Sequence, residues 1–134
     1  YAATDLLKFA QEADHVVNLM PDKPATTGVL NQAFFGALKL HSMFINAGRG
    51  SAIIEDALLN ALDNGTLQAA VLDVFTQEPL PEKHPFWTHP KVVVTAHTAA
   101  VSSPEDVASV FVANAKRYIA NEALHYQFDF NKGY

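Results

Sequence analysis

Residues 42–75 read SMFINAGRGSAIIEDALLNALDNGTLQAAVLDVF, and this stretch decides the fold. It begins with a compact apolar run over 42–47 and ends with a second one over 69–75. Between the two runs, apolar residues at helical spacing over 55–62 predict a helix, which Asn64-Gly65 would end in a left-handed C-cap. A strand, a helix and a second strand with short joins are typical of a parallel βαβ unit with a right-handed crossover.

The same alternation continues on both sides of this unit. Further strands are predicted over 15–20 and 91–96, and further helices over 4–13, over 31–40 and onward from Pro104. Because the apolar runs are continuous rather than alternating, we expect strands that are buried on both faces. The predicted fold class is therefore α/β, with an open parallel sheet. Three aromatic residues are expected in the core: Phe34, Phe35 and Phe111.

The composition narrows the classes of function. The chain has 134 residues, of which 49% are hydrophobic and 17% charged, as in globular domains rather than disordered chains. A net charge of −5, with nine scattered Lys and Arg residues, argues against a nucleic acid or an anionic membrane as partner. The absence of cysteine excludes disulfides and cysteine-based zinc sites, and no apolar run approaches the ~20 residues that cross a bilayer. We expect a cytoplasmic protein.

Polar side chains gather where the predicted strands end. Arg49 follows the second strand, Asp73 and Glu78 lie at and beyond the end of the third, and His97 follows the fourth. Each one alone is more typical of a surface turn or a loop charge. Together, however, an Arg can bind a carboxylate, a His can exchange a proton near neutral pH, and a carboxylate can hold that His protonated. Because ligands of open α/β sheets bind beyond the strand ends, this set suits the reduction of a 2-keto acid by hydride.

Four spaced segments carry a family resemblance. Residues 13–31 fit the pattern A-D-x-V-x-x-x-x-P-x-x-x-x-T-x-G-x-x-N, and residues 46–58 are similar to N-x-x-R-G-x-x-V-x-E-x-A-L. Residues 65–81 are similar to G-x-(x)3-A-x-L-D-V-F-x-x-E-P-L, and His97 opens a final His-Thr-Ala-Ala motif. In this order the segments resemble the D-isomer-specific 2-hydroxyacid dehydrogenases, on their glyoxylate/hydroxypyruvate-reductase-like or phosphoglycerate-dehydrogenase-like side.

The resemblance implies an oxidoreductase that transfers hydride between NAD or NADP and a small 2-keto or 2-hydroxy acid. It makes residues 1–120 the second half of a Rossmann-type nucleotide-binding domain, with a C-terminal helix, and residues 121–134 a tail that packs on a substrate domain. Arg49 would bind the substrate carboxylate, His97 would be the general acid, and Glu78 would hold His97 protonated. The implied cofactor-binding residues are Met20, Pro21, Ala47, Gly48, Arg49, Asp73, His97 and Ala100. No metal site is implied.

One element of the family is absent from the sequence. No Gly-x-Gly-x-x-Gly loop occurs in the 134 residues, nor the residue beyond it that would select NAD or NADP. We therefore expect the first half of the Rossmann-type domain and the substrate domain to lie outside this chain, and the chain alone to bind NAD(P)H poorly. Gly48 stands where the resemblance leads us to expect Ala, and we expect this change to be mild.

Three hypotheses about function stay open at this point. The first is the catalytic half of a nicotinamide-dependent reductase. The second is an inactive truncated fragment whose one capacity is self-association, and the third is an NAD-sensing, corepressor-like relative, which an intact Arg-Glu-His trio does not exclude. The unpaired edge of the first strand also predicts a homo-oligomer, as a dimer.

Overall fold

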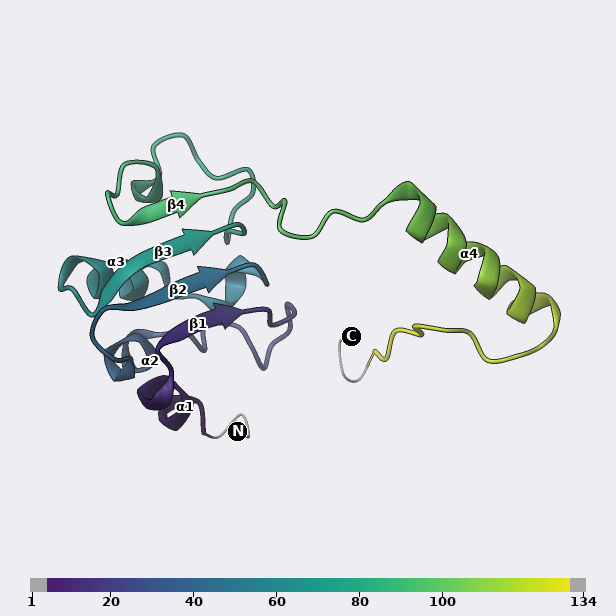
Figure 1. Cartoon of the computed structure of the whole chain (residues 1–134), viewed down its shortest axis with the longest axis horizontal. Coiled ribbons are helices and arrows are strands. Elements are labelled where there is room, and N and C mark those ends of the chain that lie inside the picture. Colours follow the sequence, from purple (N-terminus) through teal and green to yellow (C-terminus); the bar gives the residue numbers. More distant parts are fainter. Residues whose placement is uncertain (1–4, 131–134) are drawn as a thin grey trace. The chain divides into compact units, whose positions relative to one another are not determined.

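The computed structural model describes residues 5–130. Its internal contacts divide the chain into two compact units, residues 1–98 and residues 99–134, and each unit is described by itself. The sheet lies in the first unit and a long helix lies in the second (Figure 1). The assignment of 1–120 to a nucleotide-binding domain and of 121–134 to a separate tail stays a prediction.

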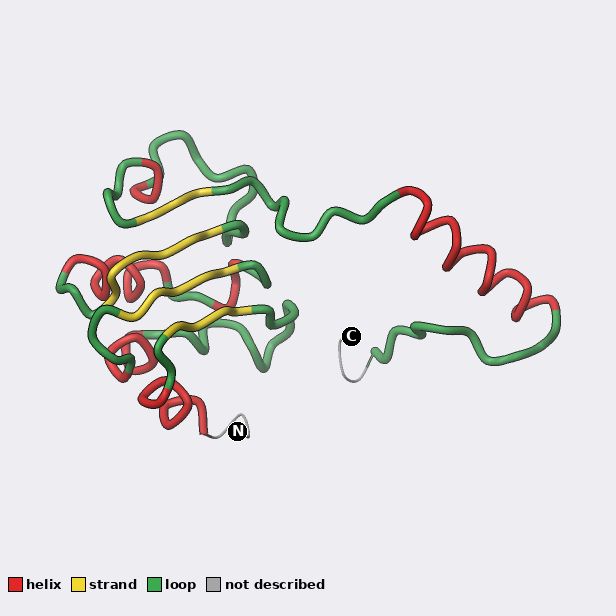
Figure 2. Tube along the Cα trace, in the orientation of Figure 1, coloured by secondary structure: helices red, strands yellow, loops and turns green. Residues whose placement is uncertain are grey.

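The sheet of the first unit consists of parallel strands. They are β1 (His15–Asn18), β2 (Ser42–Asn46), β3 (Leu67–Leu72) and β4 (Val92–Val94), in the spatial order β1-β2-β3-β4 (Figure 2). The predicted open parallel sheet is therefore confirmed. β3 ends before the predicted residue 75. Asp73 still donates its backbone N–H to the carbonyl oxygen of Asn46 at 2.9 Å, and the chain then leaves the sheet.

Three helices of the first unit are α1 (Leu6–Glu12), α2 (Gln32–Ala37) and α3 (Glu55–Asp63). Asn31 caps α2 as predicted, because its side chain accepts hydrogen bonds from two backbone N–H groups of the first turn. α2 ends earlier than predicted, since Leu38 takes an extended conformation. Gly65 has a φ of +84°, the left-handed conformation that was predicted after α3. Thr4, the predicted start of the first helix, lies outside the described residues.

Within the first unit, the helices α1, α2 and α3 cover one face of the sheet, and none of them lies on the other. A right-handed crossover puts its helix on the same face as long as the strand order runs in one direction, as it does here. α1 packs beside α2, α2 beside α3, and α3 against β3. On the opposite face, Val17 and Val93 stand in one cross-strand row and are 54% and 56% exposed. The expectation that the strands are buried on both faces is therefore wrong for this chain.

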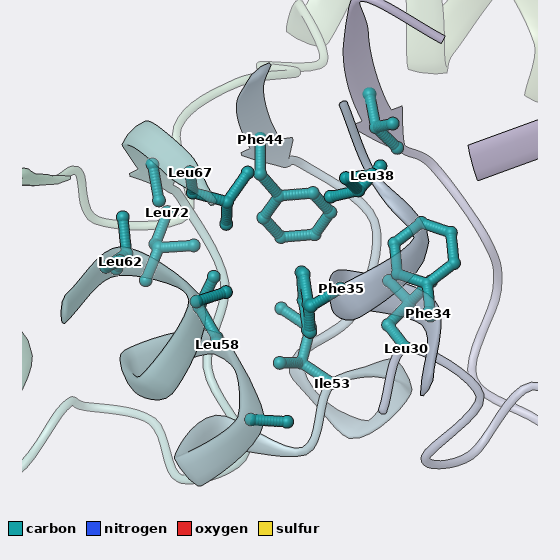
Figure 3. Packing of buried hydrophobic residues seen from close by; sticks show 14 of the residues in the cluster. Leu30, Phe34, Phe35, Leu38, Phe44, Ile53, Leu58, Leu62, Leu67 and Leu72 are labelled. Carbon is teal, nitrogen blue, oxygen red and sulfur yellow. The ribbon is translucent and has the colours of Figure 1, made fainter. Parts of the chain in front are cut away.

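The core lies between the covered face and these helices (Figure 3). Phe35 meets both Phe34 and Phe44 edge to face, with ring centroids 5.3 Å apart in each pair, and all three rings are fully buried. Large aliphatic side chains of the same cluster pack around these rings: Leu30, Leu38, Ile53, Leu58, Leu62, Leu67 and Leu72. The predicted core positions of Phe34 and Phe35 are confirmed.

The second unit contains α4 (Pro104–Ile119), which begins with a proline in its first turn as predicted. Ser103 caps it, because its hydroxyl oxygen accepts from the backbone N–H of Asp106 at 3.1 Å. Phe111 is 72% exposed, so the prediction that it belongs to the core is wrong here. Within the described part of this unit, α4 is the only regular element, and no second helix or strand is available to bury its apolar side chains.

The chain after α4 folds back onto the helix, where the side chains of Asn114 and Arg117 bind it. Asn114 donates from Nδ2 to the carbonyl oxygen of His125 at 3.1 Å and accepts from the His125 N–H at 2.8 Å. The last four residues of the predicted tail, 131–134, lie outside the described part of the chain. Over residues 5–130, no helix combines the length and the apolar character that would let it span a membrane.

Replacing Phe35 by alanine tests the position of the core. We expect Phe35→Ala to lower the free energy of unfolding by about 3–5 kcal/mol, because it removes a fully buried ring with two edge-to-face contacts. Phe111→Ala is the control, and its exposed ring should change the free energy of unfolding by less than ~0.5 kcal/mol. Urea denaturation followed by circular dichroism measures both, and equal effects would contradict this core.

Candidate active site

Buried amide hydrogen bonds join the C-terminal ends of β1, β2 and β3. Asn18, the last residue of β1, donates from Nδ2 to Oδ1 of Asn46, the last residue of β2, at 2.8 Å. Asn46 donates from Nδ2 to the carbonyl oxygen of Val74 at 3.4 Å, and its Oδ1 also accepts from the Gly48 N–H at 3.3 Å. Both asparagines are buried. The loops that follow three strands are thereby fixed to one another.

Arg49 lies between two glycines that allow neighbouring loops to approach closely. A Cβ at Gly48 would lie 2.8 Å from the backbone nitrogen of Met20, and a Cβ at Gly50 would lie 1.9 Å from the carbonyl carbon of Phe75. The Met20 N–H itself donates to Oδ1 of Asn18 at the end of β1, at 3.0 Å. The expectation that Gly48 is a mild change from Ala is therefore wrong, since a Cβ fits there only if the loop after β1 shifts.

The side chain of Arg49 is exposed at this junction. Its Nη1 donates to the carbonyl oxygen of Gly48 at 2.8 Å, which orients the guanidinium along its own loop. A guanidinium has five N–H donors in a planar fork, and the fork matches the two oxygens of a carboxylate. Since the backbone on both sides of Arg49 is packed against other loops, the point at which its side chain is attached is held in place.

Asp73 shapes the turn that carries His97. Its Oδ1 accepts hydrogen bonds from the hydroxyl of Thr95 and, at 2.9 Å, from the backbone N–H of Thr98. Its carbonyl oxygen accepts from the His97 N–H at 2.8 Å. His97 has a φ of 55°, a left-handed conformation that costs a residue with a side chain on the order of 1–2 kcal/mol. The bonds to Asp73 on either side of His97 offset that cost and hold the turn.

His97 and Glu78 form a hydrogen-bonded acid/base pair. His97 Nδ1 lies 2.7 Å from Glu78 Oε2, and Glu78 Oε1 accepts from the Phe75 N–H at 2.9 Å. The hydrogen bond with His97, then that with the Phe75 amide and, to a lesser degree, the charge of Arg49 hold the pKa of the Glu78 carboxyl below its ordinary value. Because Nδ1 of His97 is bonded to the carboxylate, Nε2 is the ring atom that can exchange a proton with a ligand.

A pocket of about 430 Å³ opens beside this pair. Its lining consists of the polar residues Asp73, Glu78, Thr95 and His97 and the apolar residues Phe75, Pro79, Leu80, Trp87 and Ala96. Trp87 is held in place by a hydrogen bond from Nε1 to the carbonyl oxygen of Pro81, at 2.9 Å. An apolar wall with a few convergent polar groups is typical of a small-molecule site.

The structure brings most of the predicted site residues together. At the C-terminal edge of the sheet lie Met20, Pro21, Ala47, Gly48, Arg49, Asp73, Glu78 and His97. Ala100 lies in the second unit. The chemical roles of all these residues stay predictions. Sequence reasoning missed Asn18, Asn46 and Thr95, although an asparagine that ends each of two successive apolar strands was a usable signal, because buried amides need partners.

Comparison with known proteins identifies the family. Residues 1–99 match the NAD-binding domain of the D-isomer specific 2-hydroxyacid dehydrogenases. The chain belongs to this family. It is 44% identical over 119 residues to glyoxylate/hydroxypyruvate reductase A of Photorhabdus laumondii, a match that covers 89% of this chain and 38% of that protein. Its identity to the reductase of the same name from Serratia proteamaculans is 48% over 99 residues, covering 74% of this chain and 32% of that one.

Solved structures of the family share the fold. A D-isomer specific 2-hydroxyacid dehydrogenase from Xanthobacter autotrophicus Py2, in complex with NADPH and MES, matches with a TM-score of 0.93 and 37% identity, over 98% of this chain and 42% of that one. An NADPH-dependent glyoxylate/hydroxypyruvate reductase from Sinorhizobium meliloti, in complex with NADP and sulfate, matches with a TM-score of 0.90 and 39% identity, over 100% of this chain and 44% of that one. The predicted family and Rossmann-type fold are confirmed, and the chain spans less than half the length of these relatives.

The glycines around Arg49 can be tested against a third glycine. We expect Gly50→Ala to lower the free energy of unfolding by about 3 kcal/mol, the upper end for overpacked sites, because its Cβ would overlap the Phe75 backbone. Gly36→Ala is the matched control: it lies within α2 with nothing within 4 Å of its Cβ, and should raise the free energy of unfolding by ~0.5–1 kcal/mol. Thermal and urea denaturation give both values. A harmless Gly50→Ala would contradict the close approach of the two loops.

The hydrogen bond between Glu78 and His97 predicts the direction of a titration. We expect His97→Ala to raise the pKa of Glu78 toward its ordinary value, with part of the lowering retained through the Phe75 amide. In the parent chain, the small stabilisation from this exposed pair is present above the unfolded-state pKa of Glu78 and is lost as pH falls through its lower folded-state pKa. Carboxyl ¹³C NMR measures the titration, with His89→Ala as control. An unchanged Glu78 titration in His97→Ala would show that the pair does not form.

Proposed function

We propose that this chain provides the acid/base and carboxylate-binding groups of an NAD(P)-dependent reductase of small 2-keto acids, with glyoxylate and hydroxypyruvate as the first candidates. The observation that carries the proposal is the 2.7 Å contact between His97 Nδ1 and Glu78 Oε2, at the same sheet edge as Arg49. Membership of the family and the names of the relatives, which are glyoxylate/hydroxypyruvate reductases, support this choice of substrate.

The residues at the strand ends fit the nicotinamide end of a cofactor. The loops at Met20 and Gly48 approach so closely that a Cβ at Gly48 would lie 2.8 Å from the Met20 nitrogen, so backbone groups of both loops lie together at this edge of the sheet. Asp73 adds a buried carboxylate. The residues of the first unit that would hold the cofactor are Met20, Pro21, Ala47, Gly48, Arg49, Asp73 and His97. Bound NADPH or NADH would supply the hydride. Because these 134 residues contain no Gly-x-Gly-x-x-Gly loop, other groups would have to bind the phosphates of the cofactor.

The proton and the substrate are handled by three side chains in this proposal. Arg49 binds the substrate carboxylate through its guanidinium fork and orients the adjacent keto carbon. His97 donates the proton on Nε2 to the keto oxygen, which becomes the hydroxyl of the product, and in the reverse direction the neutral ring takes that proton back. Glu78 accepts from Nδ1 of His97, so the ring keeps its orientation and the positive charge of its protonated form is stabilised.

Two further predictions belong to the whole protein. The proposed homodimer is supported by β1, which is an edge strand of this sheet and exposes Val17 by 54%, while Leu19, just after the strand, is 69% exposed. A location in the cytoplasm also stays a prediction.

The proposed function is tested in a chimera in which this chain replaces the matching segment of the Sinorhizobium meliloti reductase. We expect NADPH oxidation with glyoxylate and hydroxypyruvate, measured by the loss of NADPH absorbance. His97→Asn should lower kcat by ~10²–10⁴-fold, since it removes the general acid. Arg49→Gln should raise KM by at least ~10-fold, because a charged hydrogen bond to the substrate is lost.

The matched control is His89→Asn, a histidine outside the acid/base pair, which should leave both constants within ~2-fold. A chimera that binds NADPH and turns over as well with His97→Asn as without it would refute the proposed acid. Isothermal titration of the 134-residue chain with NADH and NADPH completes the test. We expect the chain alone to bind both cofactors more weakly than the chimera does. Tight binding by the chain alone would show that it holds the cofactor phosphates by other means.

A further inference from the structure

The loop over residues 76–90 carries Glu78, and it is tied to the two ends of α3 by histidines. His84 Nε2 lies 3.3 Å from Oε2 of Glu55, the first residue of α3. His89 Nε2 lies 3.2 Å from Oδ1 of Asp63, the last residue of α3. A proline-rich loop of this length, in which η3 (Pro85–Trp87) is the one helical turn described, depends on such side-chain bonds for its position.

The bond from His84 has a defined direction. Its Nδ1 accepts from the backbone N–H of Phe86 at 3.3 Å, which assigns the hydrogen of the neutral ring to Nε2. Nε2–H then donates to Glu55. The His84 ring also packs on Phe86, with centroids 4.5 Å apart, and Phe86 is only 2% exposed. His84 is therefore fixed through both of its nitrogens and through one face of its ring.

The carboxylate that bonds to His84 is less exposed than the one that bonds to His89, and His84 is nearer to Glu78 along the chain. The side chains of His84 and Glu55 are 17% and 31% exposed, whereas those of His89 and Asp63 are 11% and 73% exposed. A pocket of about 250 Å³ is lined by Glu55, Thr76, Gln77, Leu80, Pro81 and His84. The residues on either side of Glu78 thus lie around the contact between His84 and Glu55.

We propose that His84 and Glu55 are positioning residues for the reaction: their hydrogen bond fixes the loop that presents Glu78 to His97. The inference rests on the proposed function, and it concerns two residues that take no part in the transfer of hydride or proton. Their effect passes through the backbone from His84 to Glu78, six positions earlier in the chain. If the two residues had only a structural role, substituting them would lower the free energy of unfolding without a specific change at Glu78.

Two substitutions at His84 separate its two hydrogen bonds. In His84→Asn, the side-chain oxygen can still accept from the Phe86 N–H, but the donor to Glu55 is lost. In His84→Gln, the longer side chain can place an amide N–H where Nε2 stands, so the bond to Glu55 can form. Asparagine and glutamine are uncharged, so neither substitution changes the charge when the imidazole is neutral. His89→Asn removes the corresponding donor at the far end of α3 and serves as the control.

The measurements are made by NMR on the 134-residue chain, without substrate or cofactor. For His84→Asn we expect the pKa of Glu78 to rise toward its ordinary value. The Phe75 amide, which donates to Glu78, should exchange with solvent at least ~5-fold faster, on the scale of one lost hydrogen bond. His84→Gln and His89→Asn should leave both readouts within ~2-fold or within error. Unchanged Glu78 and Phe75 signals in a folded His84→Asn would overturn the proposal.

Glu55→Ala provides a second route if His84→Asn fails to fold. It breaks the same bond from the helix side, and Asp56→Ala on the same turn is its control. Removing a negative charge can only lower the pKa of another carboxyl through electrostatics, so a rise at Glu78 would report a moved loop. The same change in Glu55→Ala and Asp56→Ala would overturn the proposal. Because no reductase activity is measured, a failed activity assay and a failed positioning test are distinguishable.

Discussion

The hydrogen bond between Asn18 and Asn46 is the constraint on which the arrangement of the site depends. It lies out of contact with solvent at the ends of two neighbouring strands, and Asn46 extends it to the loop after a third. A buried amide that loses its partner costs about 1–3 kcal/mol, so the three loops cannot move apart independently. Gly48 and Gly50 then allow backbone contacts that no other residue type would permit. The side chain of Arg49 is therefore exposed, while its backbone is held by the asparagine hydrogen bonds and by the close contacts of the glycines on both sides.

The acid/base pair is held in a different way from the backbone around Arg49. His97 and Glu78 are 51% and 36% exposed, and each is held by hydrogen bonds from its own side of the site. Asp73 fixes the turn of His97 through its carboxylate and its carbonyl oxygen. Glu78 stands on a loop without strand structure, so its position depends on the hydrogen bond from His84 to Glu55, the first residue of α3. The geometry of the pair therefore responds to residues that do not touch it.

Much of the fold could be predicted from the order of apolar runs, because a short crossover between parallel strands has one allowed hand. The same rule explains where prediction failed. The run over 15–20 was expected to be buried on both faces, yet Val17 is exposed, because every crossover described here returns on one face of the sheet. Phe111 has core-like spacing on α4 and is exposed for a related reason. Periodicity shows which side chains form an apolar stripe, but it does not show whether another element covers that stripe.

The sequence by itself determined the family, the parallel α/β sheet and the identity of the residues at the strand ends, because these follow from short-range pattern and from motif order. The motifs also implied that Glu78 pairs with His97, but only the tertiary structure gave the geometry of that contact, which joins atoms 2.7 Å apart in residues 19 positions apart. The bond of His84 with Glu55, between residues 29 positions apart, was decided by the tertiary structure alone. Such contacts depend on how loops from different strands pack against one another. Packing of this kind is set by close backbone approach and buried hydrogen bonds, for which a single sequence has no periodic signal.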